Sequence, residues 1–371
     1  MYFGTDNTKA EGAYSLAIGR DTSTKGEGAL AAGRFSKAIG ESSLAAGNNT
    51  EARGRGSVAF GHGSVAQGEN AFVTGESNKA EGLDSAAFGK QATAKGSYSI
   101  AAGHGAQANG AVSAAFGTDT VASEQNSFTA GMSTKATQWN ATALGERTQA
   151  NGRNSLATGL NTTASGDVST AMGMKTKASG AYSLVTGNNT ESVGENSFSG
   201  GLRSQAIGDS SLAFGVDSKA KGRYAVALGE GSTASGKAAT ALGENSAAKG
   251  NNSFASMGGF AQGNNSLALG KGAFALGIAH YQNESKMINA GVSYGGHNKF
   301  MTNLGVTWKV GSGNKEEKQE EAYRKGPVTS VYVLEEVVRD LKAENHEQKE
   351  QIENLNKEVE SLKALVNQLI K

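Results

Sequence analysis

Histidine, serine and glycine are the residues of this sequence whose types could support chemistry. His62 and His104 each follow a regularly spaced glycine, but 42 residues separate them, too far apart along a repeating fold to share a metal. Serine recurs at a fixed interval with no histidine in step, so no nucleophile–base pair is indicated. The pairs Gly54/Gly56 and Gly61/Gly63 match part of the dinucleotide-binding motif. They do not lie between a predicted strand and a predicted helix, as that motif requires. The sequence predicts no catalytic residue, no metal site and no cofactor, and we expect a protein that is not an enzyme.

The composition restricts the class of protein further. The 371 residues include 53 Gly, 1 Pro and no Cys, and 35 basic residues nearly balance 34 acidic ones for a net charge of +1. Glycine is about twice its usual 7%, yet it does not recur at every third position and proline is nearly absent, which excludes collagen. The near-neutral net charge does not indicate the basic surface that a nucleic-acid-binding protein needs. Without cysteine the chain has no disulfide bonds.

A fourteen-residue repeat covers most of the chain. Glycine stands at every fourteenth position from 19 to 243, in 17 consecutive positions. A second series runs seven residues later, from 26 to 250, and lacks glycine only at Glu124 and Gln138. Alanine usually stands two residues before each glycine. The unit is Ser-Leu-Ala-x-Gly, a polar turn, x-Ala-x-Gly and a second turn.

This repeat predicts a solenoid with one unit per coil. Each half-unit is too short for a helix and its turn, and its period-two alternation is typical of a strand of about four residues. Strands of successive coils would pair in parallel at about 4.8 Å per coil, so that 17 coils span roughly 80 Å. Glycine would recur where the backbone needs positive φ or where two coils approach closely.

The predicted interior is thin, and a second apolar stripe lies outside it. Ala, Ser and Gly would fill the inside of each coil and bury little apolar area. A lone chain would leave the outer stripe exposed as one long patch, which soluble monomers avoid. We therefore expect several copies to pack side by side around a rotation axis. The stripe consists of Leu16, Leu30, Leu44, Val58, Phe72, Ile100, Phe128 and Leu156.

The tandem Ser-Leu-Ala-x-Gly units over residues 1–270 resemble the head of YadA-like trimeric autotransporter adhesins. The resemblance implies a mainly β fold with a left-handed parallel β-roll in each chain and a homotrimeric head. It also implies type V secretion to the bacterial outer membrane and cell surface, where an extracellular head attaches to a host cell-surface glycoprotein or an extracellular-matrix protein. Because Met1-Tyr2-Phe3-Gly4 leads directly into the repeat, we expect a mature fragment whose export signal is already absent.

The pattern changes at residues 271–311. Three strands of about ten residues alternate apolar and small residues, separated by turns at 282–285 and 295–298. One apolar face and the aromatic residues Tyr281, Tyr294 and Trp308 near strand ends are typical of the wall of a membrane barrel. The stretch resembles the family's membrane anchor, in which each of three chains gives four strands, so a fourth strand would come from 258–270 or be missing. The alternative is a sheet that caps the solenoid.

The C-terminal part predicts a charged linker at 312–329 and an α-helical coiled coil at 330–371. Glu344 with Lys349 and Glu358 with Lys363 have the spacing of interchain ion pairs. β-branched residues at a with Leu at d ordinarily favour two strands, whereas the head favours three. If residues 271–311 form a barrel, the coiled coil lies in the periplasm. Its core positions are Val331, Leu334, Val338, Leu341, Asn345, Gln348, Ile352, Leu355, Val359, Leu362, Val366 and Leu369.

A binding site on a repeat scaffold is expected where the consensus breaks. Glu124 and Gln138 replace glycine in successive coils, and Trp139 occupies a turn position that is mostly polar elsewhere. Exposed tryptophan is a favoured anchor at interfaces. We therefore predict a ligand-binding site at Trp139, Gln138, Glu124 and Gln125, the alternative being that Trp139 packs on a neighbouring chain.

Two functions follow from these features. The first is a surface adhesin whose three repeated faces bind a host surface through many weak contacts. The second is a non-adhesive structural fibre, such as a phage tail-fibre spacer, in which the β-roll only projects another part.

Overall fold

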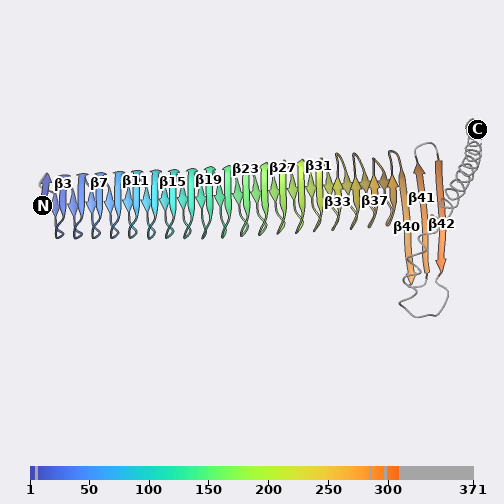
Figure 1. Ribbon diagram of the computed structural model, residues 1–371, viewed down its shortest axis with the longest axis horizontal. Helices are drawn as coiled ribbons and strands as arrows, with labels where there is room; N and C mark the ends of the chain where they lie inside the picture. The colour runs from blue at the N-terminus through green and yellow to red at the C-terminus, as the bar shows by residue number, and fades with distance from the viewer. Residues whose placement is uncertain (5–6, 284–285, 296–298, 309–371) are drawn as a thin grey trace, which may run out of the picture. The chain divides into compact units, whose positions relative to one another are not determined.

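The structure, a computed structural model, describes residues 1–4, 7–283, 286–295 and 299–308, with side chains up to residue 275. Each fourteen-residue unit forms one coil of a parallel β-solenoid, and the coils stand in a single row through the unit Met1–Gly277 (Figure 1). Every coil contributes one strand to each of two sheets. The odd-numbered strands build a 20-stranded sheet, called sheet A here, and the short even-numbered strands build sheet B. The predicted β-solenoid is confirmed.

The strands of sheet A cover the Leu-Ala-x-Gly segment of each unit. They are β1 (Tyr2–Gly4), β3 (Leu16–Arg20), β5 (Leu30–Arg34), β7 (Leu44–Asn48), β9 (Val58–His62), β11 (Phe72–Glu76), β13 (Ala86–Lys90), β15 (Ile100–His104), β17 (Ala114–Thr118), β19 (Phe128–Met132), β21 (Thr142–Glu146), β23 (Leu156–Leu160), β25 (Thr170–Met174), β27 (Leu184–Asn188), β29 (Phe198–Leu202), β31 (Leu212–Val216), β33 (Val226–Leu228), β35 (Thr240–Leu242), β37 (Phe254–Ser256) and β39 (Leu267–Leu269).

The strands of sheet B cover the x-Ala segment. They are β2 (Lys9–Ala10), β4 (Ser23–Thr24), β6 (Lys37–Ala38), β8 (Glu51–Ala52), β10 (Val65–Ala66), β12 (Lys79–Ala80), β14 (Thr93–Ala94), β16 (Gln107–Ala108), β18 (Val121–Ala122), β20 (Lys135–Ala136), β22 (Gln149–Ala150), β24 (Thr163–Ala164), β26 (Lys177–Ala178), β28 (Glu191–Ser192), β30 (Gln205–Ala206), β32 (Lys219–Ala220), β34 (Thr233–Ala234), β36 (Ala247–Ala248) and β38 (Phe260–Ala261).

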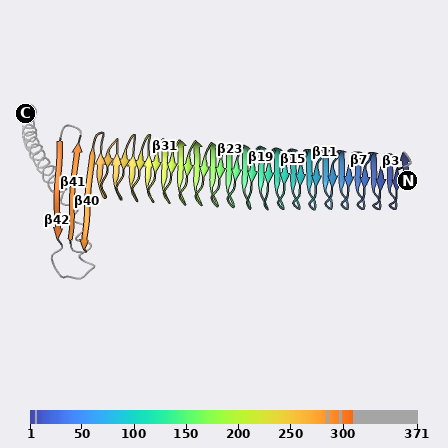
Figure 2. The same cartoon turned by 180° about the vertical axis from the view of Figure 1, so that it is seen from behind.

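The register between coils equals the sequence period. Leu16 pairs with Leu30 and Gly19 with Gly33, so each residue lies beside its equivalent in the next coil. The turns stack in the same way, because the N–H of Ser42 donates to the carbonyl of Glu27 at 2.8 Å. Viewed from behind, the same row of paired strands runs through Met1–Gly277 (Figure 2). Backbone hydrogen bonds between coils therefore run the length of this unit.

The core between the two sheets consists of small side chains. Ala17 of sheet A and Ala38 of sheet B are fully buried, as are their equivalents in most coils. The largest fully buried side chains are Val73, Val185 and Asn78, followed by threonines. Glycines of the second series, such as Gly26 and Gly82, are buried as well, whereas those of the first series lie near the ends of the sheet A strands. Such small side chains let the two sheets approach closely but contribute little hydrophobic stabilisation per residue.

The two glycine series are required for different reasons. A Cβ on Gly33 would lie 2.1 Å from the carbonyl oxygen of Gly47, and Gly33 also has φ +110°. A Cβ on Gly26 would lie 1.9 Å from the carbonyl oxygen of Gly40, but Gly26 has no positive φ. The first series therefore needs glycine for both close approach and backbone conformation, the second for close approach alone.

A serine precedes many strands of sheet A, and in several coils its hydroxyl closes a turn. Ser43 Oγ donates a hydrogen bond to the carbonyl oxygen of Gly40 at 2.6 Å, and Ser57 Oγ does the same to Gly54 at 2.7 Å. Ser43 and Ser57 are buried, so these bonds satisfy hydroxyls that have lost contact with water. The recurrent serine is therefore structural.

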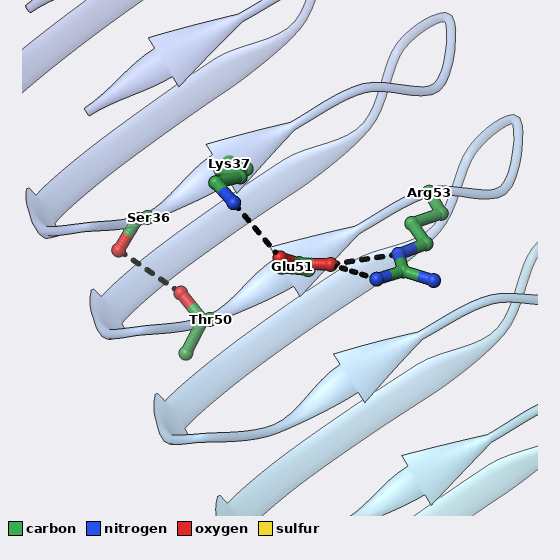
Figure 3. A network of polar contacts seen from close by, with 5 residues as sticks. All are labelled: Ser36, Lys37, Thr50, Glu51 and Arg53. Carbon is green, nitrogen blue, oxygen red and sulfur yellow. Dashed lines mark hydrogen bonds and ion pairs between the residues drawn. The ribbon is translucent and has the colours of Figure 1, made fainter. Parts of the chain in front are cut away.

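Inward and outward polar groups alternate along sheet B (Figure 3). Inside, Thr50 Oγ1 donates to Ser36 Oγ at 3.0 Å. Outside, Lys37 Nζ donates to Glu51 Oε1 at 3.2 Å, and Arg53 Nε donates to Glu51 Oε2 at 2.7 Å. Burial opposes ionisation of Glu51, but the hydrogen bonds and charges of Arg53 and Lys37 together lower the pKa of Glu51 below its ordinary value. Charged side chains thus lie on the outer face of sheet B in this part of the stack.

The outer face of sheet A is uncharged at the first and third positions of its strands. Leu16 and its equivalents are half-buried and point away from the core, while Ile18, Phe60 and Phe214 are exposed at the second outward position. From Leu16 to Ser256, no coil places a charged residue at the first or third position of its sheet A strand. Charges occur only where the strand ends, at Arg20, Arg34, Glu76, Lys90 and Glu146. The predicted apolar stripe is thus two residues wide.

Longer strands follow the last short coils. They are β40 (Phe274–Asn283), β41 (Lys286–Gly295) and β42 (Lys299–Trp308). The start of β40 pairs with β38 in parallel, at Phe260↔Phe274 and Ala261↔Ala275. Residues 258–270, considered as the source of a fourth long strand, instead contain the short strands β38 and β39. That possibility was wrong because the stretch keeps the coil register.

Several sequence predictions fall on residues that are not described. The linker at 312–329 and the coiled-coil core from Val331 to Leu369 lie outside the described residues. The side chains of Tyr281, Tyr294 and Trp308 are also outside the described part. Among the residues that are described, no helix has the length and apolar character needed to cross a membrane.

Candidate binding surface at Trp139

Trp139 lies in the turn that leads from β20 of sheet B to β21 of sheet A. The turn is closed by the N–H of Ala141, which donates to the carbonyl oxygen of Gln138 at 3.1 Å. Asn140 has φ +55°, a conformation that asparagine adopts more readily than most residues. Backbone geometry thus holds Trp139 at the outermost part of the coil.

Glu124 and Gln138 occupy positions that hold glycine in the other coils, where adjacent coils lie too close for a Cβ atom. A Cβ on Gly110 would lie 2.1 Å from the carbonyl oxygen of Glu124 in the next coil. In the stack of these turns, the bond from Asn140 N to Gln125 O is 3.1 Å, the longest of its kind in the described residues. The coils of Glu124 and Gln138 therefore separate slightly, because a Cβ has to fit between them.

The predicted site residues lie together on the surface. Glu124, Gln125, Gln138 and Trp139 are all exposed, with Trp139 57% exposed. Trp139 Nε1 donates a hydrogen bond to Glu124 Oε2 at 3.1 Å. One polar edge of the indole is thereby fixed, while more than half of the side chain stays accessible to a ligand.

An asparagine ladder beside Trp139 was missed from the sequence. Asn126 Nδ2 donates to Asn140 Oδ1 at 3.0 Å, and Asn140 Nδ2 donates to Asn154 Oδ1 at 2.9 Å. The signal was present as three asparagines at fourteen-residue spacing, which the repeat stacks on one another. The ladder gives the surface amide groups that can donate and accept hydrogen bonds.

An ion pair continues the surface in the next coils. Arg153 Nε donates to Asp167 Oδ2 at 3.0 Å, and the Arg153 backbone N–H donates to Asp167 Oδ1 at 2.9 Å. The side-chain hydrogen bonds from Arg153 hold the pKa of Asp167 below its ordinary value and raise the pKa of Arg153. This pair orders the turn that follows Trp139 without adding net charge.

The arrangement is suited to contact rather than to reaction. His62 and His104 are the last residues of β9 and β15, and three coils separate them. In the described part of the chain, no group of three His, Cys, Asp or Glu side chains is placed to hold a metal ion. The surface at Trp139 instead offers an aromatic anchor flanked by amides and a neutralised ion pair.

The coil geometry agrees with a known repeat. The family model described as YadA head domain repeat (2 copies) matches residues 6–22, 10–36, 25–50, 52–77, 80–106, 140–162, 164–190, 206–232, 234–256 and 259–278, which is more than half of the chain. The chain belongs to the YadA-like family of trimeric autotransporter adhesins. A search of the curated proteins found no match.

The matches to the YadA head repeat leave out residues 107–139. Glu124, Gln125, Gln138 and Trp139 all fall in that gap. The two missing glycines thus lie in a stretch that the family model does not match.

Proposed function

We propose that this chain forms the head of a trimeric adhesin that attaches a bacterium to host cells or to extracellular matrix. Membership of the YadA-like family supports the proposal. The single observation that carries it further is the exposed, hydrogen-bonded Trp139 on an otherwise regular β-roll. Attachment needs only contact and avidity, so the role is non-enzymatic.

The uncharged outer face of sheet A supports the trimer. Leu16, Leu44 and Ile100 lie half-exposed on it, and the face extends along the whole coil stack. Three copies that pack these faces around a common axis would remove a long apolar surface from water. In this arrangement the charged outer face of sheet B, with Glu51 and Arg53, remains in solvent. The left-handed coil and the trimer number are part of the proposal.

The C-terminal part is proposed to attach the head to the outer membrane. Strands β40, β41 and β42 are ten residues long each, the length at which a tilted strand crosses the hydrocarbon layer. We assign residues 1–270 to the head, 271–311 to the anchor strands, 312–329 to the linker and 330–371 to a periplasmic coiled coil. The three strands of each copy would hold the protein in the outer membrane, and the head would then be displayed on the cell surface.

Display of the full chain on a non-adherent bacterium tests this function. Cells that carry the chain should bind host cells or matrix-coated wells, whereas cells with an empty vector should not. The outer-membrane fraction should contain heat-resistant trimers that need detergent for extraction. Trimers that appear on the surface without any attachment would favour the structural-fibre alternative.

A further inference from the structure

Five exposed aromatic side chains stand in one row along a single edge of the β-roll. They are Tyr14, Tyr98, Trp139, Tyr182 and Tyr224, and their side chains are between 46% and 92% exposed. The four tyrosines occupy the positive-φ position of the turn between sheet B and sheet A, and Trp139 directly precedes that position in its own coil. All five therefore project from equivalent turns.

The row has a period of its own. Tyr98, Trp139, Tyr182 and Tyr224 fall in every third coil, and Tyr14 lies 84 residues before Tyr98. At 4.8 Å per coil, adjacent rings from Tyr98 onward are about 14 Å apart and the four span about 43 Å. Because the fourteen-residue repeat alone would place such a ring in every coil or in none, the triple spacing is a separate feature of the sequence.

Turn formation does not account for the tyrosines. A residue with positive φ favours Gly, Asn or Asp, and Asn126 and Asn154 hold the same position in other coils. The Tyr98 and Tyr182 N–H groups donate to the carbonyls of the preceding coil at 2.7 and 2.8 Å, so their turns stack as the others do. A large ring at this position is unfavourable for the backbone and useful only for what it presents to solvent.

The rings are separate from one another and little covered. Small residues, Ala13, Ser97 and Ala181, directly precede Tyr14, Tyr98 and Tyr182. Within the described part of the chain, a cation lies over a ring of this row at Tyr224, where the guanidinium carbon of Arg223 is 4.8 Å from the ring centre. The row is therefore a set of single aromatic platforms at regular intervals.

The charge beside the rings argues against a polyanion. Acidic and basic residues nearly balance in the turns between sheet B and sheet A, so this edge has no strong positive charge. Two of the basic residues, Arg55 and Arg153, are already paired with Glu69 and Asp167. Between the platforms, amides such as the Asn126–Asn140–Asn154 ladder supply donors and acceptors without charge. This edge is suited to an uncharged ligand rich in hydroxyl groups.

We propose that the aromatic row binds a linear, uncharged polysaccharide, with each ring stacked on the apolar face of one sugar unit. The regular interval of about 14 Å matches a polymer that repeats along its length, since each ring would then meet an equivalent unit of the chain. The amides and carboxylates between the rings would hydrogen-bond sugar hydroxyls. The proposal rests on the adhesive function and names the class of ligand, while the uncharged outer face of sheet A remains the contact between copies.

The test compares the full-length trimer with a variant that lacks the four evenly spaced rings of the row, from Tyr98 to Tyr224. Tyr98→Asn, Tyr182→Asn, Tyr224→Asn and Trp139→Gln are combined, because Asn126 and Gln125 hold the corresponding positions in a neighbouring coil and keep the turn geometry. Binding is measured by affinity electrophoresis in native gels that contain linear β-glucan, amylose, xylan or chitin oligomers, with heparin as the polyanion. Phe35→Asn, at the positive-φ position of the other turn, is the matched control.

The wild-type protein should be retarded by at least one neutral polysaccharide and not by heparin. Its affinity should rise with chain length, because only a longer chain reaches a second ring. The fourfold variant should bind at least about tenfold more weakly, whereas Phe35→Asn and the ring-preserving Tyr98→Phe should bind as the wild type does. All variants should keep the trimer mass and melting temperature.

Three results would overturn the proposal. If no neutral polysaccharide retards the wild-type protein while displayed cells still attach, the ligand class is wrong and the adhesive function stands. If cells do not attach either, the proposed function itself fails. If the fourfold variant loses the trimer mass, the row is a contact between copies and not a ligand surface.

Discussion

Trp139 Nε1 and Glu124 Oε2 lie 3.1 Å apart, joined by a hydrogen bond between adjacent coils. Glu124 has a side chain to offer only because it replaces a glycine of the second series. The bond therefore couples two departures from the repeat, one at each residue. A partly fixed indole loses less conformational freedom on binding than a free one.

Glu124→Ala should weaken attachment without unfolding the head. The exposed hydrogen bond contributes about 0.5–1.5 kcal/mol, so the melting temperature should change little, while the loss of the acceptor frees the Trp139 ring. Cells that display the variant should attach less well than wild-type cells in the same assay. Glu230→Ala, which removes an exposed carboxylate from the other turn of a distant coil, is the control for a general change of surface charge. Unchanged attachment with Glu124→Ala would mean that the orientation of the indole has no role.

Gly33→Ala should destabilise the coil stack strongly. The new Cβ would lie 2.1 Å from the carbonyl oxygen of Gly47, and alanine would be strained at φ +110°. Overpacking and backbone strain each cost about 1–3 kcal/mol, which thermal unfolding followed by circular dichroism can detect. Gly28→Asn is the contrasting variant, because its φ of +64° suits asparagine and the nearest atom to its Cβ, Ser42 Oγ, is 3.7 Å away. Equal melting temperatures for the two variants would contradict the steric account.

The period of the sequence was sufficient to predict the coils and their register. Fourteen-residue spacing aligns Leu16 with Leu30, and period-two alternation places Ala17 inside and Leu16 outside. The ladder from Asn126 was also readable, because its members keep the repeat. These features depend only on backbone periodicity.

Side-chain contacts between coils required the structure. Whether Gly26 is needed for space or for φ depends on the distance to the next coil, which the sequence does not contain. The bond between Trp139 and Glu124 depends on rotamers in two coils. The pattern of residues 258–270 was ambiguous as well, since a shortened coil and a barrel strand share the same alternation.

Lowering the pH should reduce the stability that the ion pairs of Glu51 contribute on the outer face of sheet B. Its pKa is lowered in the folded chain, because the hydrogen bonds and charges of Arg53 and Lys37 outweigh the effect of burial. A lowered pKa means that the stabilisation is complete above the ordinary value of 4.5 and is lost as the pH falls through the folded value. Glu51→Gln should therefore melt below the wild type at pH 7, and the difference should shrink as the pH falls below 4.5.

Melting curves from pH 7 to pH 3 measure this effect of Glu51. Gln149→Ala, at the equivalent position of a distant coil, removes no charge and should show a difference from wild type that does not vary with pH. A constant difference for Glu51→Gln would show that its ion pairs do not contribute to stability.

Asn78 is the one asparagine among the largest buried side chains of the described core, and its loss should be costly. Its Nδ2 donates to the carbonyls of Thr74 and Gly89, both at 2.7 Å, and its Oδ1 accepts from Ala92 N at 2.8 Å. Asn78→Ala leaves these buried groups without partners, at about 1–3 kcal/mol for each unsatisfied group. Asn78→Thr should lose less, because Thr50 fills the same core position. Denaturant unfolding compares the two, and an alanine variant as stable as the threonine variant would contradict this account.

Charges placed on the outer face of sheet A should separate the copies. Ile100→Asp, Phe128→Asp and Leu156→Asp introduce three carboxylates at half-buried outward positions where no coil from Leu16 to Ser256 carries a charge. The coil itself should stay folded, because these side chains point away from the Ala and Ser core. Packing against equivalent positions of sister copies would bury the carboxylates, and burying unpaired charges is strongly unfavourable. Light scattering after size exclusion should then give a smaller mass than wild type at equal concentration. Gln107→Asp, Gln149→Asp and Gln205→Asp together place the same three charges on sheet B and should leave the mass unchanged. If the triple variant keeps the wild-type mass, sheet A is not the contact between copies.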